Sequence, residues 1–196
     1  MRRPNGSTWS RYGGFCDSGC GSAATDVMYD GRMVSAEQVI QQLGLFPHPE
    51  GGFYAETFRG PALPFEMPGR GPRSASTAIY FLLRTRDFSA LHVVLSDEVW
   101  HHYAGDTLEL HCFTRDGAHR EVRLGSDFTE GERPQHVVLH GELQAARVVP
   151  GPHGFALCGC TVAPGFDFAD FRMPSRAELL AELPAHAELV TALTRG

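Results

Sequence analysis

The chain lacks the long apolar runs and the basic clusters that mark several classes of protein. No hydrophobic stretch approaches the roughly 18 residues of a membrane span, and the Gly/Ser-rich start has no hydrophobic centre typical of a signal peptide. No Lys/Arg run forms the basic stripe that nucleic acid or an anionic membrane would require, and the formal net charge is -6. We therefore expect neither partner and predict a cytoplasmic protein.

Cysteine is present, but not in the number or spacing of a disulfide framework. The chain has five cysteines, an odd number: Cys16, Cys20, Cys112, Cys158 and Cys160. Their scatter along the chain favours reduced thiols. The first two have no second pair of ligands nearby, so two free thiols are a better interpretation than a zinc site.

Turn-forming residues, in contrast, are abundant. The 196 residues include 22 Gly and 13 Pro, and 42% are hydrophobic, a composition that favours short elements around one well-filled core. Residues 1–32 show neither helical nor strand periodicity, so we predict a disordered extension there and a single domain over 33–196. The four prolines and three glycines of residues 60–73 predict a loop.

Short strands are predicted along most of this domain because hydrophobic and polar positions alternate. The predicted strands cover residues 53–59, 77–83, 90–95, 98–103, 107–114, 121–124, 135–139, 142–149 and 154–162. Capping boxes begin a helix at Ser35 and another at Ser175. These helices are predicted over residues 35–43 and 175–183, with a final helix over 184–193. The pattern predicts an all-β sandwich or closed jelly roll with the helices outside the barrel.

The stretch 92–105 places ionisable side chains within two apolar runs that are typical of neighbouring strands in a hairpin. A three-residue loop puts five side chains on one surface: His92, Val94, Glu98, Trp100 and His102. A two-residue loop pairs His92 with His101 and turns Glu98 away, because a slip of one residue exchanges the two faces of a strand. Hydrophobicity does not decide between these registers, since both faces carry apolar residues.

Four segments of the sequence carry a family resemblance: PHPEGGFYAETFR, STAIYFLL, HVVLSDEVWHHYAGDTLEL and GCTVAPGFDF. They resemble the signatures of a cupin family of unknown function, DUF985, over roughly residues 35–183. The spacing from Glu98 to Gly105 also matches the first cupin motif, H-x-H-x(3,4)-E-x(6)-G, with His92 at the first histidine. The resemblance implies a cupin double-stranded β-helix, a jelly-roll barrel, that forms a homodimer.

Two positions depart from the cupin motifs, and both reduce the number of expected metal ligands. The second histidine of the motif falls on Val94, and the second motif places Gln144 at the usual fourth-ligand position. A catalytic metal generally needs three good ligands. The resemblance leaves His92, Glu98 and a poor oxygen donor, Gln144, unless His102 turns inward. It therefore implies either no metal or a weakly bound divalent metal on these residues.

Without a metal, His92 beside Glu98 is an acid/base pair suited to proton abstraction next to a carbonyl. A carboxylate fixes the imidazole tautomer and raises its pKa toward the working pH. Cupin sugar epimerases, to which the family is structurally similar, use a histidine and a tyrosine for this chemistry. Three phenols are available here and the sequence does not choose among them: Tyr54, Tyr80 and Tyr103.

The predicted ligand is a small polar molecule, a sugar derivative or a keto acid, bound inside the barrel. His92 and Glu98 are the predicted catalytic residues of an isomerase, epimerase or lyase. The predicted substrate-binding residues are Trp100, His102, Gln144, Glu56, Arg59 and Tyr54, with Glu56 and Arg59 at the mouth. Two alternatives remain: a metal-dependent oxygenase or hydrolase, and a binding protein without catalysis.

Other aromatic and ionisable residues are expected to be structural. We expect the segment 48–50 to shape a turn and the aromatic side chains of residues 166–171 to form a packing strip, with a dimer interface as one possible location. Solvated positions are expected for five histidines: His111, His119, His136, His153 and His186.

Overall fold

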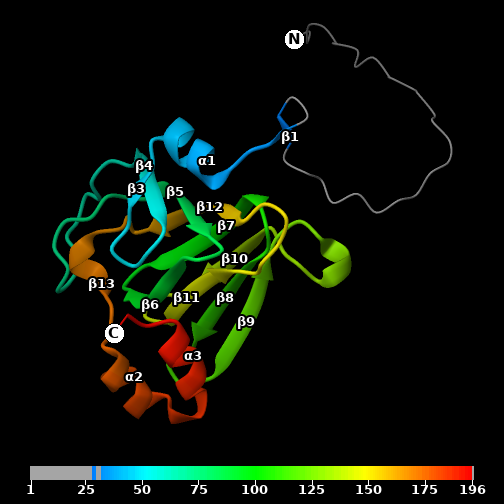
Figure 1. Ribbon diagram of the computed structural model, residues 1–196. Coiled ribbons are helices and arrows are strands. Elements are labelled where there is room, and N and C mark those ends of the chain that lie inside the picture. The colour runs from blue at the N-terminus through cyan, green and yellow to red at the C-terminus, as the bar shows by residue number, and fades with distance from the viewer. Residues whose placement is uncertain (1–27, 30–31, 196) are drawn as a thin grey trace, which may run out of the picture.

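The computed structural model describes residues 28–29 and 32–195, and two antiparallel sheets form its body (Figure 1). The predicted extension over 1–32 falls mainly outside the described residues, as do Cys16 and Cys20. Its described part, β1 (Met28–Tyr29), pairs with β2 (Arg32–Met33).

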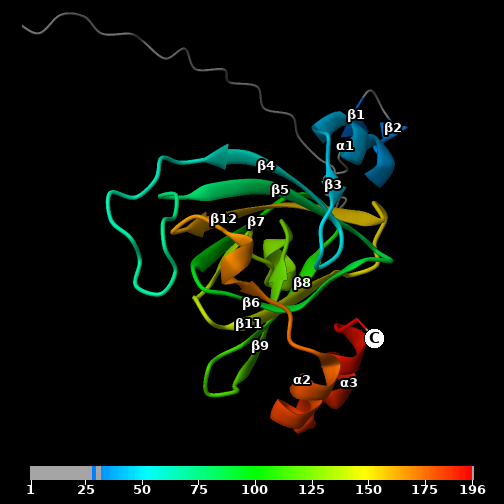
Figure 2. The same ribbon diagram turned by 90° about the vertical axis from the view of Figure 1, so that its left-hand side faces the viewer.

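Strands far apart in the sequence lie side by side in both sheets. The six-stranded sheet has the order β10 (Gln135–Val138), β7 (Asp97–Gly105), β12 (Phe155–Ala163), β5 (Thr77–Arg84), β4 (Phe53–Arg59) and β3 (Phe46–Pro47). The five-stranded sheet has the order β13 (Phe171–Arg172), β6 (Phe88–Val94), β11 (Leu143–Val148), β8 (Leu108–Phe113) and β9 (His119–Leu124). Figure 2 shows the sheets as two layers. The predicted all-β jelly-roll fold is confirmed.

The core lies between the sheets because alternate residues of each strand point inward. In β8 the inward residues Leu108, Leu110 and Cys112 are buried, as the alternation predicts. Facing them from the other sheet are Phe81 and Trp100, whose rings meet edge to face at 5.6 Å between centroids. The three cysteines in the described part of the chain are all free and buried.

Helices cover the outer faces of both sheets, as predicted. Helix α1 (Ala36–Leu43) packs against the six-stranded sheet, and α2 (Arg176–Glu182) and α3 (Ala187–Ala192) pack against the five-stranded sheet (Figures 1 and 2). Both predicted capping boxes form, at Ser35 and Ser175. The predicted last helix begins with a 3-10 turn, η3 (Pro184–His186).

The predicted hairpin at 92–105 is wrong. β6 pairs with β11 and β13 in one sheet, whereas β7 pairs with β10 and β12 in the other. The chain crosses between the sheets after Val94. His92 and Glu98 still both face the interior, because each lies on the inner side of its own sheet. Neither register considered from the sequence describes the pairing, which is made with strands distant along the chain.

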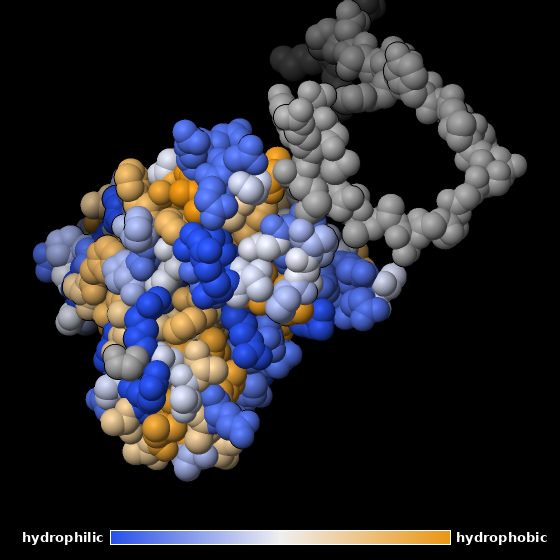
Figure 3. All heavy atoms as spheres, in the orientation of Figure 1, coloured by the Kyte–Doolittle hydropathy of each residue, from blue (hydrophilic) through white to orange (hydrophobic). Residues whose placement is uncertain are grey.

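The connection between β4 and β5 is the predicted loop, with only isolated bridges such as Ala62 to Ser74 in addition to turns. Two short 3-10 segments, η1 (Phe128–Glu130) and η2 (Phe168–Asp170), lie in other connections. No helix among the described residues is long and apolar enough to cross a membrane. On the face drawn in Figure 3, hydrophilic and hydrophobic residues are interspersed.

Candidate functional site

A cavity of about 290 Å³ is lined by strands of both sheets and therefore lies inside the barrel. It is lined by His48, Glu50, Tyr54, Glu56, Arg59, Thr77, Ile79, Phe81, His92, Val94, Glu98, Cys160, Val162, Phe166, Asp167 and Phe168. This combination of apolar walls and a few convergent polar groups is typical of a small-molecule site.

Three buried ionisable side chains, Glu50, His92 and Glu98, line the cavity. They come from the turn before β4, from β6 and from β7 respectively. His92 Nε2 lies 3.5 Å from Glu50 Oε2. The exposed fractions of the three residues are 6%, 2% and 7%. Water therefore screens them poorly, and burial has a large effect on their protonation.

The tautomer of His92 follows from its backbone contact. Nδ1 lies 2.7 Å from the carbonyl oxygen of Ala90, an acceptor only, so Nδ1 carries the proton of the neutral ring. Nε2 then presents its lone pair toward Glu50. Burial lowers the pKa of His92, although Glu98 acts in the opposite direction. The predicted rise of this pKa is therefore wrong: desolvation of the imidazolium outweighs the nearby carboxylate.

Both carboxyl groups hold a proton more strongly than usual. Burial raises the pKa of Glu50 to about 8, even though Ser89 Oγ donates to it at 2.9 Å and Arg195 favours its charged form. Burial also raises the pKa of Glu98, and the charge of Glu50 adds to the effect. At neutral pH, Glu50 is consequently a carboxylic acid facing a neutral imidazole, a pairing of proton donor and acceptor.

Hydrogen bonds from residues outside the cavity lining hold the Glu98 side chain in place. Trp100 Nε1 donates to Gln144 Oε1 at 2.9 Å, and Gln144 Nε2 donates to Glu98 Oε2 at 2.6 Å. Trp100 and Gln144 do not line the cavity, contrary to expectation. Gln144 is the strand partner of His92 across β11 and β6, so its side chain also points inward, where it reaches and orients Glu98.

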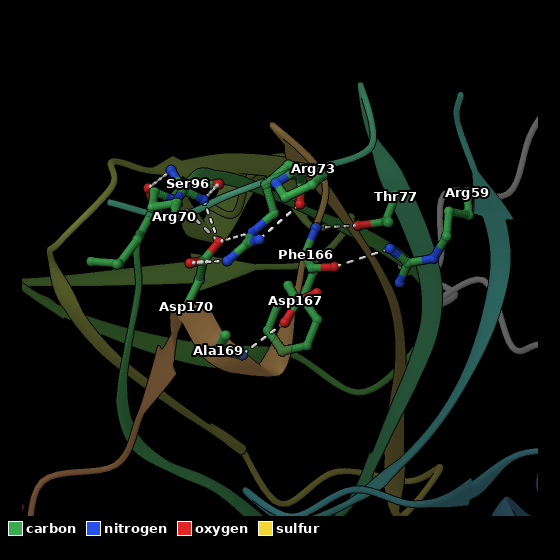
Figure 4. Close-up of polar contacts among 11 residues, drawn as sticks. Arg59, Arg70, Arg73, Thr77, Ser96, Phe166, Asp167, Ala169 and Asp170 are labelled. Atoms are coloured by element: carbon green, nitrogen blue, oxygen red, sulfur yellow. Dashed lines mark hydrogen bonds and ion pairs between the residues drawn. The ribbon is translucent and has the colours of Figure 1, made fainter. Parts of the chain in front are cut away.

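The mouth of the cavity carries the predicted pair Glu56 and Arg59. Arg59 donates to both carboxylate oxygens of Glu56, from Nε at 2.9 Å and from Nη2 at 2.6 Å. It also donates to the carbonyl oxygen of Phe166, whose backbone N–H donates to Thr77 Oγ1 (Figure 4). An anionic ligand group would have to compete with Glu56 for the guanidinium.

Next to the mouth, a buried ion cluster ties the long β4–β5 loop to η2. Asp170 accepts two hydrogen bonds from Arg73, at 2.7 and 2.8 Å, and two from Arg70, at 3.1 and 2.5 Å (Figure 4). Arg70 also reaches Ser96, in the crossing between β6 and β7. This cluster fixes the end of the segment 166–170, whose aromatic side chains cover the cavity.

The structure also locates the candidate phenols, His102 and the aromatic residues of the segment 166–171. Of the three candidate phenols, Tyr54 lines the cavity, whereas Tyr80 and Tyr103 pack against each other with ring centroids 6.2 Å apart. His102 does not line the cavity, and its Nε2 lies 3.0 Å from the backbone oxygen of Asp106. Phe166 and Phe168 line the cavity, and Phe171 packs against the His92 ring at 5.3 Å.

Sequence reasoning missed His48 and Glu50. They do form a turn, since Gly51 N–H donates to the His48 carbonyl, but their side chains also reach the cavity. The two are 3.5 Å apart, and burial lowers the pKa of His48 to about 4. The sequence feature that could have indicated this inward turn is the pair of glycines after Glu50, Gly51 and Gly52. Gly51 has φ of 119°, a conformation that favours glycine and aims this turn inward.

The predicted metal ligands do not fit a metal as a set. The Gln144 oxygen already accepts the Trp100 indole proton and its nitrogen donates to Glu98, so the amide presents no donor atom to the cavity. Val94 lies on the cavity wall at the position of a motif histidine, and its side chain has no ligand atom.

Two facing antiparallel sheets, closed around a cavity with inward polar residues, define a cupin-type barrel protein. The chain belongs to the family described as Cupin superfamily (DUF985), whose model matches residues 37–174. It is 30% identical over 148 residues to an uncharacterized protein of Saccharomyces cerevisiae, YML079W, covering 69% of this chain and 73% of the yeast protein.

Two solved structures are similar to this fold. A hypothetical protein from Leishmania major is 33% identical, with a TM-score of 0.78, and the match covers 83% of this chain and 100% of the other. A protein from Shewanella oneidensis is 37% identical, with a TM-score of 0.75 and coverage of 83% and 99%. These relatives support the family and the fold, and their names state no activity.

Proposed function

We propose that this protein binds a small carbonyl compound, a sugar derivative or a keto acid, in the barrel cavity and catalyses proton transfer next to the carbonyl without a metal. The observation that carries the proposal is the buried contact between Glu50 and His92, with Glu98 on the same cavity. It pairs a proton acceptor with a proton donor whose pKa, about 8, lies near neutrality.

The proposed step uses each group in one role. His92 Nε2 takes the proton from the carbon next to the carbonyl, and the C–H electron pair forms a carbon–carbon double bond. The carbonyl π pair moves to oxygen, which accepts the proton of Glu50. Return of a proton to carbon gives the isomer or epimer. Glu98 stabilises the imidazolium that His92 becomes, since its charge favours the protonated ring.

The residues at the mouth and on the wall of the cavity support this choice of ligand. Arg59 would bind a carboxylate or another anionic group with its planar guanidinium if the ligand displaced Glu56, and Tyr54 offers a phenol on the cavity wall. The remaining wall is largely apolar, with Ile79, Phe81 and Val162. A compact molecule with one anionic or polyhydroxylated end and one carbonyl end fits this distribution.

The test is exchange of carbon-bound hydrogen in deuterium oxide, followed by proton NMR over a panel of aldoses, ketoses and 2-keto acids. With a substrate, the wild-type protein removes the signal of the hydrogen next to the carbonyl. His92→Asn and Glu50→Gln are each expected to slow this exchange at least about 100-fold, the usual contribution of a general acid or base. Glu98→Gln is expected to slow it as well.

The matched control is His101→Asn, on the same strand as Glu98, where the imidazole lies 3.2 Å from Thr161 Oγ1 and does not line the cavity. It should exchange at the wild-type rate, and thermal unfolding should show that all variants are folded. Equal exchange in wild type and His92→Asn would refute the proposal. Recovery of a tightly bound, unchanged ligand with no exchange would favour the binding protein without catalysis.

A further inference from the structure

A second group of ionisable side chains lies on the outer face of the five-stranded sheet, away from the cavity. Glu109 and His111 alternate on β8, and Glu121 lies directly opposite His111 on β9. One ligand atom from each of the three lies within 4.8 Å of the other two. The alternation that buries Leu108 and Leu110 inside the barrel turns these polar residues outward.

His111 is 2% exposed, so its predicted solvated position is wrong. Its Nδ1 lies 3.2 Å from His119 Nε2, which satisfies that side of the ring. Its Nε2 is buried without a hydrogen-bond partner and lies 3.6 Å from Glu109 Oε1. An unpaired buried nitrogen costs free energy, and a bound cation would accept its lone pair.

The two carboxylates next to this nitrogen also favour a cation. Glu109 precedes His111 by two residues on the same face of β8, and Glu121 is paired with His111 on β9, so both carboxylates lie next to the unpaired nitrogen. Glu109 is half-buried and Glu121 is exposed, which leaves one side of the cluster open to water. One imidazole nitrogen and two carboxylates are a donor set suited to zinc and similar divalent ions.

We propose that Glu109, His111 and Glu121 form a binding site for a divalent transition-metal ion of the zinc class, separate from the barrel cavity. His119 orients the ligand ring by accepting the proton of His111 Nδ1, in the role that a carboxylate, a carbonyl or a water more often has behind a metal-bound histidine. His119 in turn lies against His186 of η3, with ring centroids 5.0 Å apart. Metal binding would therefore stiffen the contact between the barrel and its C-terminal helices.

Arg147 limits the affinity of this site. It donates to both oxygens of Glu109, from Nε at 2.7 Å and from Nη2 at 3.2 Å, and places a positive charge next to the cation. Arg147→Gln removes that charge and frees both oxygens of Glu109. The proposal therefore predicts a variant with tighter zinc binding, a gain that a damaged fold would not produce.

The experiment is calorimetric titration of zinc into chelator-treated, full-length protein. Glu121→Gln should lose one zinc equivalent or bind it at least about 10-fold more weakly than wild type, as removal of even an outer ligand partner does. His111→Gln should do the same, whereas Arg147→Gln should bind more tightly. Cys16 and Cys20 remain in every protein, so any zinc that they hold cancels in the comparison.

Two controls locate the site. Glu130→Gln removes an exposed carboxylate of η1, and His92→Asn removes the cavity imidazole; both should retain the zinc equivalent that Glu121→Gln loses. Cobalt(II) in place of zinc should give a visible spectrum without the intense thiolate band that cysteine ligands produce. Wild-type zinc binding in Glu121→Gln, or loss of the same equivalent in His92→Asn, would overturn the proposal.

Discussion

Burial, more than charge pairing, sets the protonation of the side chains around the cavity. The hydrogen bond from Ser89 and the charge of Arg195 both favour ionised Glu50, yet its pKa rises to about 8. Each pKa unit corresponds to about 1.4 kcal/mol, so desolvation contributes more than these two interactions together. The consequence is an acid that titrates near neutral pH at the end of a small cavity.

Glu50→Gln should change how stability depends on pH. In the wild type, Glu50 keeps its proton in the folded state up to about pH 8, whereas an unfolded glutamate loses it near 4.5. Stability from this group is thus fully present below pH 4.5 and is lost as the pH rises to 8. The glutamine variant is neutral at every pH and avoids this loss. Above pH 8 it should therefore be more stable than wild type, by an amount on the order of a few kcal/mol.

Urea unfolding from pH 4 to 9 would measure this difference, with Glu66→Gln as the control at an exposed glutamate. That control should follow the wild-type curve. A Glu50→Gln curve that also runs parallel to wild type over the whole range would show that Glu50 has an ordinary pKa, and would remove the main support for its role as an acid.

At the scale of strands and helices, alternation and capping boxes in the sequence predicted the elements. Ion pairs between elements, which the sequence did not indicate, hold the cover of the cavity. Strand boundaries for β5 and β12 and both capping boxes agree closely with the alternation and spacing seen in the sequence. The cover of the cavity depends on a different kind of contact, in which Asp170 joins a loop that precedes β5 to the segment before β13.

Asp170→Asn should destabilise the protein and weaken ligand binding together. The substitution leaves buried guanidinium protons of Arg70 and Arg73 poorly satisfied, a cost of roughly 1–3 kcal/mol. It also loosens the 166–170 segment over the cavity. Because Arg73 and Arg70 lower the pKa of Asp170 to about 2 from 3.8, the wild-type advantage is present above pH 3.8 and is lost as the pH falls through 2.

Urea midpoints at neutral and acidic pH test this, with Asp116→Asn in the exposed β8–β9 turn as the matched aspartate control. We expect a clear drop for Asp170→Asn at neutral pH, little change for the control, and convergence with wild type in acid. A midpoint equal to that of the control at neutral pH would mean that the cluster does not hold the loop.

Across the whole protein, successive strands mostly alternate between the two sheets. β3, β4, β5, β7, β10 and β12 lie in one sheet, and β6, β8, β9, β11 and β13 lie in the other, so the alternation begins at β5. Such non-local pairing closes the barrel, but it leaves β10 and β3 as free edges in the described part of the six-stranded sheet. Val137 and Leu139, at the β10 edge, are 44% and 52% exposed. An apolar, unpaired edge is a surface where a second chain can pair.

We therefore retain the homodimer implied by the family resemblance as a prediction. Light scattering on the eluting protein should give twice the mass of a single chain. Val137 faces outward on β10. The substitution Val137→Lys should shift the protein toward monomer if the β10 edge is the dimer contact. A single-chain mass for the wild type across a wide concentration range would contradict the dimer.

The site was only partly predictable. His92, Glu98, Tyr54, Glu56 and Arg59 were identified from spacing and family motifs, and all five line the cavity. The hairpin proposed for β6 and β7 was wrong because strand pairing in a jelly roll is not set by neighbours in the chain. Gln144 and Trp100 were expected at the ligand and instead position Glu98 from behind.

Local patterns in the chain were enough to predict most of the strands, the capped helices and the two faces of β8, while the cupin family came from the resemblance of four motifs. The strands, helices and faces depend on residues close in sequence, whose periodicity indicates which positions are buried. Closure of the barrel decided the rest. It brought Glu50, in a turn that looked purely structural, to within 3.5 Å of His92, and burial there changed the protonation of both. Desolvation depends on all surrounding residues at once, so no local pattern encodes it.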